Sequence, residues 1–122
     1  RLLIMKQENT NLINQVEVNS FLHRVKKNFP NFVASVITDK NGFTIGSDIS
    51  KRLWVHENKL SLWAISKNKE NKELLDDPNL VQLKFDIDKA KRFKLFILLE
   101  KSKYNKSGKS GLKNLIRAQE LF

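Results

Sequence analysis

The sequence predicts an α/β (α+β) domain in which a single antiparallel sheet is flanked by helices. Three observations carry this prediction: a hairpin pattern over residues 32–49, two further strand patterns between residues 80 and 100, and helical patterns around them. The resulting order is helix–strand–strand–helix–strand–strand–helix. With 122 residues the chain has the size of one domain. We therefore predict a flexible N-terminal segment over residues 1–14 and a single domain over residues 15–122.

The first helix is predicted over residues 15–28, because apolar side chains recur there at helical spacing. Asn14 and Glu17 stand three residues apart, as in a capping box that begins a helix. Pro30 ends the helix, since the residue before a proline disfavours α geometry. The apolar stripe consists of Val18, Phe21, Leu22, Val25 and Phe29.

The hairpin consists of two strand patterns joined by the turn sequence Asp-Lys-Asn-Gly at residues 39–42. Asn41 and Gly42 suit such a turn, because both residue types tolerate positive φ. The first strand is largely apolar on both faces, and Phe43 and Ile45 restart the alternation after the turn. This segment predicts two paired strands.

Residues 50–78 allow two interpretations. Leu60, Trp63 and Ala64 would share one face of a helix, whereas Leu60, Leu62 and Ala64 would share one face of a strand. The length of the segment and its Glu-, Lys- and Asn-rich continuation favour a helix of about residues 56–73. The sequence Asp-Asp-Pro-Asn at residues 76–79 marks a break.

Two more strands and a last helix complete the domain. Residues 80–88 alternate between apolar and polar side chains, which predicts a half-buried antiparallel strand. Residues 93–100 are more uniformly apolar, so we place this strand centrally in the sheet. The Lys-, Ser-, Asn- and Gly-rich residues 101–109 are predicted to form a loop, followed by a short helix with Ser110 as its N-cap.

The composition argues against several kinds of chemistry. The chain has no cysteine, which excludes disulfides and thiol catalysis and fits a cytoplasmic location. Its two histidines do not make a metal-binding set, and no Ser-His-Asp arrangement has usable spacing. The sequence Ser-Gly-Lys-Ser at residues 107–110 lacks the earlier glycine of a P-loop, whose place Lys103 takes. We expect no enzyme activity, no cofactor and no bound metal.

The hairpin region resembles the opening of the roadblock/LC7 family of small α/β modules. The residues that carry the resemblance lie at 36–39 (Val-Ile-Thr-Asp), 41–43 (Asn-Gly-Phe) and 45–47 (Ile-Gly-Ser). The order of elements resembles a divergent member of the family over roughly residues 15–122, and a longin- or profilin-like domain is the alternative. The resemblance implies a five-stranded sheet, one strand more than the patterns show. It also implies that two copies pair through the second helix and an edge strand, and that the paired helices bind a small Ras-like GTPase.

On this resemblance, the helix of residues 56–73 would contact a similar domain, in a homodimer or heterodimer, or the GTPase. The candidate interface residues are Leu60, Trp63 and Lys67. Trp54 and Trp63 would face different sides of a helix, so either one is exposed at an interface or both are buried. The implied function is a non-enzymatic dimerising scaffold that binds a small GTPase or a related complex subunit.

The net charge of +10 is uneven, because residues 84–122 carry eleven Lys and Arg against four Asp and Glu. A solubilising surface is the simpler explanation, and an anionic partner is the other. The alternative function is therefore docking on nucleic acid or on an acidic membrane. The candidate basic surface consists of Lys91, Arg92, Lys94, Lys103, Lys106 and Lys109.

Overall fold

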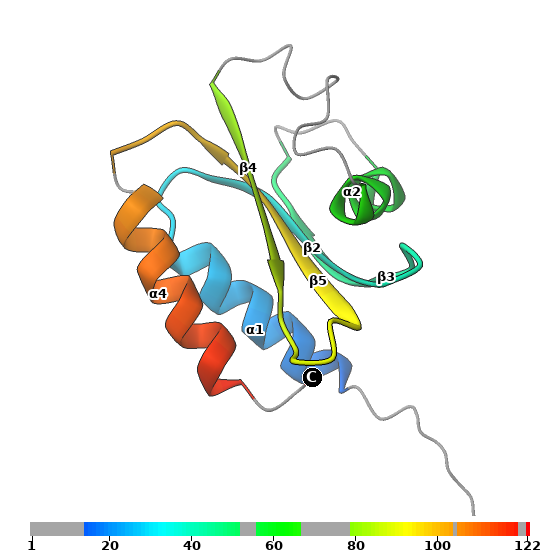
Figure 1. Ribbon diagram of the computed structural model, residues 1–122. Coiled ribbons are helices and arrows are strands. Elements are labelled where there is room, and N and C mark those ends of the chain that lie inside the picture. The colour runs from blue at the N-terminus through cyan, green and yellow to red at the C-terminus, as the bar shows by residue number, and fades with distance from the viewer. Residues whose placement is uncertain (1–13, 52–55, 67–78, 104, 120–121) are drawn as a thin grey trace, which may run out of the picture.

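The computed structural model describes residues 14–51, 56–66, 79–103, 105–119 and 122 (Figure 1). The predicted order of helices and strands is confirmed, and both strands of the hairpin lie within residues 32–49. The elements are α1 (Gln15–Lys27), β2 (Phe32–Asp39), β3 (Thr44–Ile49), α2 (Glu57–Ile65), β4 (Leu80–Asp86), β5 (Phe93–Glu100) and α4 (Asn105–Ala118).

The described strands form one antiparallel sheet in the order β3-β2-β5-β4. β5 is central as predicted, since Phe96 lies opposite Val36 of β2 and opposite Lys84 of β4. β3 and β4 lie at the two edges of this sheet, and β4 is half-buried as predicted. The fifth strand that the family resemblance implies does not occur among the described residues.

Helices cover both faces of the sheet (Figure 1). α1 and α4 lie side by side on one face, and α2 lies on the other. The apolar face of α1 is buried as predicted, together with the α4 residue Leu112 and the sheet residues Ile37, Leu95 and Ile97. A second core lies under α2 and contains Val33, Ala34, Val36, Leu60, Ala64, Phe96 and Leu98.

Side-chain hydrogen bonds cap α1 and hold the hairpin turn, at the positions that the sequence predicts. Asn14 Oδ1 accepts hydrogen bonds from the N–H groups of Val16 (2.9 Å) and Glu17 (3.3 Å), which caps α1. In the hairpin turn, Asp39 Oδ1 accepts from the N–H groups of Asn41 (2.8 Å) and Phe43 (3.0 Å). Gly42 has a φ of +89°, a conformation that favours glycine.

The middle helix is shorter than predicted. α2 ends at Ile65 rather than near residue 73, because Ser66 has an extended backbone (φ −60°, ψ 137°). The next apolar residue in the sequence is Leu74. Residues 66–73 therefore supply no apolar side chain that would extend the face formed by Leu60 and Ala64. Residues 67–78 lie outside the described part of the chain.

The last helix begins earlier than predicted. α4 starts at Asn105, so Ser110 lies inside the helix rather than at its N-cap, and the predicted loop ends before Lys109. Gly108 and Gly111 weaken the helical pattern, because glycine has low helix propensity. Their lack of a side chain instead permits close packing, since a Cβ on Gly108 would lie 2.4 Å from Phe29 Cε1. Tertiary contact with the end of α1 outweighs the local propensity.

Candidate partner-binding surfaces

α2 is held on the sheet by apolar packing and by hydroxyl contacts. Three residues of the helix itself are buried: Leu60, Ser61 and Ala64. The hydroxyl groups of Ser61 and Thr44 lie 2.6 Å apart, and the Ser47 hydroxyl donates to the Glu57 carboxylate. These contacts join α2 to the edge strand β3, so the outer surface of the helix is carried on a rigid support.

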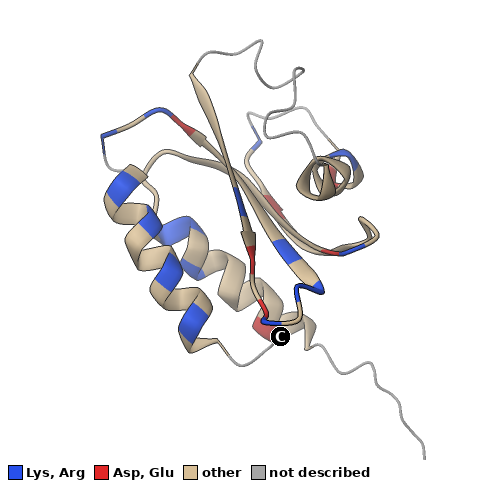
Figure 2. Cartoon of the chain, viewed as in Figure 1, with Lys and Arg blue, Asp and Glu red and all other residues tan. Residues whose placement is uncertain are grey.

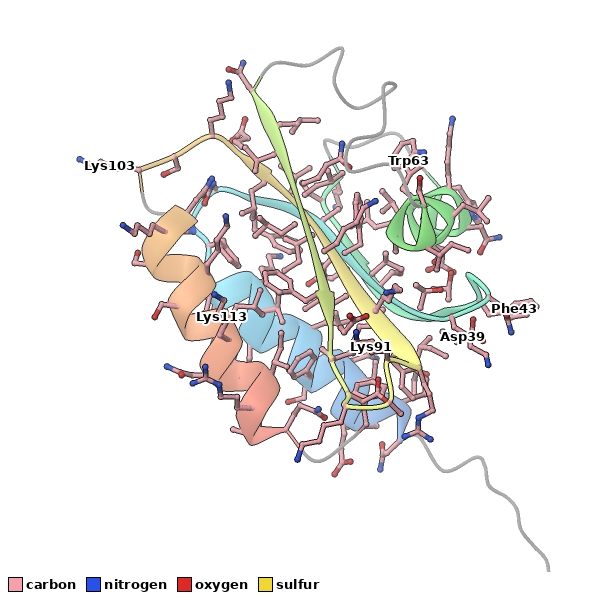
Figure 3. The ribbon with its side chains drawn as sticks, in the orientation of Figure 1. Asp39, Phe43, Trp63, Lys91, Lys103 and Lys113 are labelled. Atoms are coloured by element: carbon pink, nitrogen blue, oxygen red, sulfur yellow. The ribbon has the colours of Figure 1, made fainter. Side chains whose placement is uncertain are left out.

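The outer side of α2 and the neighbouring hairpin turn expose apolar side chains. Leu62 is 58% exposed and Phe43 is 69% exposed. The turn packs against α2 at Gly42, the residue before Phe43. A Cβ at this position would lie 3.5 Å from Leu62 Cδ2 and 3.0 Å from Ile65 Cδ1. Phe43 points away from the domain at the turn (Figure 3). We call Phe43, Leu62 and Ile65 the α2 patch; exposed apolar groups of this kind often mark protein–protein contacts.

The interface residues predicted from the sequence lie elsewhere on α2 or beyond it. Leu60 is fully buried in the chain's own second core. Trp63 is partly buried against that core, with Lys59 Nζ 5.6 Å from the centre of its ring. Lys67 and Trp54 lie outside the described residues. A role for Leu60, Trp63 and Lys67 in partner binding stays a prediction.

Sequence reasoning missed Phe43 and Leu62 as surface residues. Phe43 was assigned to the alternation of a strand, although it directly follows the turn glycine. Leu62 entered only the strand interpretation of its segment. In a helix it stands two residues from both Leu60 and Ala64, and therefore on the side away from them. That spacing is the signal that identifies it.

The six predicted basic residues fall into two groups, one that includes Lys91 and one that includes Lys103, and Figure 3 labels these two residues. Lys91 and Arg92 lie in the β4–β5 turn, and Lys94 follows on β5, on the same side of the sheet as Phe96. Arg92 pairs with Asp88 (2.9 Å) and Lys94 with Asp86 (2.7 Å). The other three are Lys103, just before α4, and Lys106 and Lys109, in its first turns.

A longer row of basic residues runs along α4. Lys106 and Lys109 continue into Lys113 and Arg117, and all four are exposed. Sequence reasoning missed Lys113 and Arg117 as surface residues, because it began the helix at residue 110. With the correct start, the spacing of three, four and four residues is the signal that they share one side. Figure 2 shows this row on α4 and further basic residues on α1.

Asp88 organises the β4–β5 turn. Its side chain is 4% exposed and accepts hydrogen bonds from the N–H groups of Arg92 (2.8 Å) and Phe93 (3.2 Å). Burial acts to raise the pKa of Asp88, but the Arg92 side chain and the two backbone N–H groups outweigh it, so the pKa lies below its usual value. The ionised carboxylate therefore stabilises the folded state at pH values above the pKa that Asp88 has in the unfolded chain. This stabilisation is lost as the pH falls through the pKa of the folded state.

We predict that Asp88→Asn lowers the free energy of unfolding by about 1–2 kcal/mol at pH 7, since charge-assisted bonds in the turn are lost. Urea unfolding at pH 7 and at about pH 3 measures this. The difference from wild type should shrink at the lower pH. Asp86→Asn is the control, because Asp86 makes an ion pair at the surface. An equal loss in both variants would contradict the role of Asp88.

Two kinds of site find no support in the described residues. None of the described helices is both long and apolar enough to cross a bilayer. Within the same residues there is no group of three or more His, Cys, Asp or Glu side chains arranged to hold a metal ion.

The fold defines a class of module. The order α-β-β-α-β-β-α, with one antiparallel sheet between α2 and the pair α1 and α4, is the roadblock-like α+β fold. A solved structure described as MglB with tetrameric arrangement matches it with a TM-score of 0.53 over 91% of this chain and 93% of that chain. The sequences are 9% identical, so the likeness concerns the fold. No protein-family model and no curated protein sequence matches the chain.

Proposed function

We propose that the chain is a non-enzymatic dimerising scaffold or regulatory module that binds a small Ras-like GTPase or a related complex subunit. The observation that carries the proposal is the α2 patch, on the side of the sheet opposite α1 and α4. The roadblock-like fold supports it, since modules that this chain resembles pair and serve such GTPases. MglB, which shares the fold, has been solved in a tetrameric arrangement.

The α2 patch can contribute binding free energy through apolar burial. Burying an exposed Leu or Phe side chain contributes about 1.5–3 kcal/mol, and two such residues are available at Phe43 and Leu62. Because Ser61 and Glu57 join α2 to β3, little ordering of the helix is needed on binding. The same helix can therefore supply a preformed surface to a second domain or to a GTPase.

The position of β3 supports the pairing of two copies. This edge strand lies beside α2, and an edge strand presents unpaired backbone groups to a neighbour. A two-fold dimer would place the same α2 patch on both sides of the contact. Two adjacent α2 helices would then form a joint platform for the GTPase.

We predict that Leu62→Asp weakens self-association by about tenfold to a hundredfold, because it places a charge in an apolar contact. Sedimentation equilibrium over a range of protein concentrations measures the dissociation constant. Val16→Asp is the matched control, since Val16 is 76% exposed and lies at the start of α1. If both variants associate like the wild type, α2 is not the pairing surface.

The GTPase partner is tested by affinity capture from nuclease-treated native lysate, with mass spectrometry of the bound proteins. We expect a small GTPase or a second roadblock-like domain with the wild type and with Val16→Asp, and its loss with Leu62→Asp. Purified candidates are then titrated against the three proteins by calorimetry. Retention of the same GTPase by Leu62→Asp would contradict binding through the α2 patch.

A further inference from the structure

The strongest unexplained feature is the basic row of α4. A residue advances about 100° around an α-helix, so Lys106, Lys109, Lys113 and Arg117 lie within an arc of about 80°. At about 1.5 Å per residue, the row is about 16 Å long. The row covers most of the length of the helix.

α1 widens this row into a surface. Arg24 and Lys27 lie across a shallow groove from Gly111 and Leu115 of α4. The helices approach closely there, since a Cβ on Gly111 would lie 2.4 Å from Asn28 Oδ1. The glycines thus bring basic residues from two helices onto one side of the molecule (Figure 2). We call this the basic face: Arg24, Lys27, Lys106, Lys109, Lys113 and Arg117.

Within the described part of the chain, no acidic side chain pairs with the charges of the basic face. α4 contains no Asp or Glu, and the acidic residue of α1, Glu17, lies in its first turn, at the other end of the helix from Lys27. Among the described residues, none of the six side chains takes part in an ion pair. The two acidic residues of the β4–β5 region, Asp86 and Asp88, are already paired with Lys94 and Arg92.

We propose that the basic face binds the headgroups of an anionic phospholipid membrane. A Lys or Arg near such a surface contributes an attraction equivalent to about a fivefold gain in affinity. The face has six such residues, all exposed, so it attaches mainly by charge. Leu115 and Ala118 line the groove between the two helices. Binding of this kind is reversible and weakens with salt.

The shape of the basic face favours a membrane over nucleic acid. Two helices side by side span about 20 Å, which exceeds the roughly 12 Å width of a DNA major groove. Single-stranded nucleic acids are held largely by stacking on aromatic rings. Phe43, the exposed aromatic residue among the described ones, lies instead at the β2–β3 turn. A broad charged surface with no exposed ring among its described residues matches a bilayer better than either nucleic acid.

The arrangement leaves the α2 patch free, because α2 covers the opposite side of the sheet (Figure 1). One molecule could therefore lie on a membrane and present α2 to a protein partner at the same time. The membrane proposal does not depend on the GTPase proposal, and each is tested by its own substitutions.

The test is cosedimentation of the full chain with vesicles of phosphatidylcholine containing about 30% phosphatidylserine. We expect binding at about 50 mM salt that falls steeply by about 200 mM, and little binding to phosphatidylcholine alone. The variant Lys106→Gln/Lys109→Gln/Lys113→Gln/Arg117→Gln should bind about a hundredfold to a thousandfold more weakly. Leu62→Asp should bind vesicles like the wild type.

The matched control is Lys40→Gln/Lys51→Gln/Lys89→Gln/Lys101→Gln, which removes the same charge from exposed positions outside the basic face. It should bind within about threefold of the wild type, because it keeps all six residues of the face. Thermal unfolding confirms that both variants fold. An equal loss in the control, or equal binding to neutral vesicles, would overturn the proposal. A DNA duplex of about 20 base pairs is added as a competitor. If the protein binds this duplex more tightly than the vesicles and leaves them, the proposal is overturned in favour of nucleic acid.

Discussion

Phe96→Ala is expected to lower the free energy of unfolding by about 3–5 kcal/mol. Phe96 is 1% exposed and is the largest fully buried side chain of the second core. It lies on the central strand β5, beneath Leu60 and Ala64 of α2. Truncation would remove buried apolar area and leave a cavity under the helix. For a domain with about 5–15 kcal/mol of total stability, this is a large fraction.

Urea unfolding followed by circular dichroism measures the effect of Phe96→Ala. Phe43→Ala is the matched control, because the same side chain is removed from a position that is 69% exposed. The control should stay within about 0.5 kcal/mol of the wild type. It should still weaken partner binding, since Phe43 belongs to the α2 patch. Similar stabilities for the two variants would mean that Phe96 is not packed as the structure shows.

Gly108→Ala is expected to cost about 2–3 kcal/mol, although alanine is the better helix former by about 1 kcal/mol. The new Cβ would lie 2.4 Å and 2.5 Å from two ring carbons of Phe29, and 2.9 Å from the backbone oxygen of Asn28. Phe29 is buried in the first core and Asn28 O belongs to the backbone, so neither moves aside cheaply. α4 would be pushed away from α1.

Gly111→Ala is the control for Gly108→Ala, because its Cβ would meet mainly the end of the Asn28 side chain, which can rotate. Its thermal unfolding midpoint should stay close to that of the wild type, while that of Gly108→Ala falls by roughly 10 °C. Gly108→Ala should also weaken vesicle binding, since the basic face needs α1 and α4 together. Equal midpoints would show that α4 does not pack on Phe29.

Both candidate surfaces could be predicted in part from the sequence. The family resemblance implied α2 as a partner helix, and the charge distribution indicated a basic region late in the chain. Both roles stay predictions. The sequence could not show that Leu60 faces inward and Leu62 outward, because the segment also fitted a strand. It could not bring Arg24 and Leu115 together either, since these residues line one groove only when α1 and α4 pack.

Local sequence patterns are enough to predict the order of the elements, the cap of α1 at Asn14, the hairpin turn at Asp39 and the central place of β5. These features depend on hydrophobic periodicity and turn chemistry, which act over a few residues. The end of α2, the place of Gly108 inside a helix and the grouping of charges on one side depend on packing between distant segments. The reason is physical: burial against distant residues such as Phe29 outweighs local helix propensity, and no local pattern records such contacts.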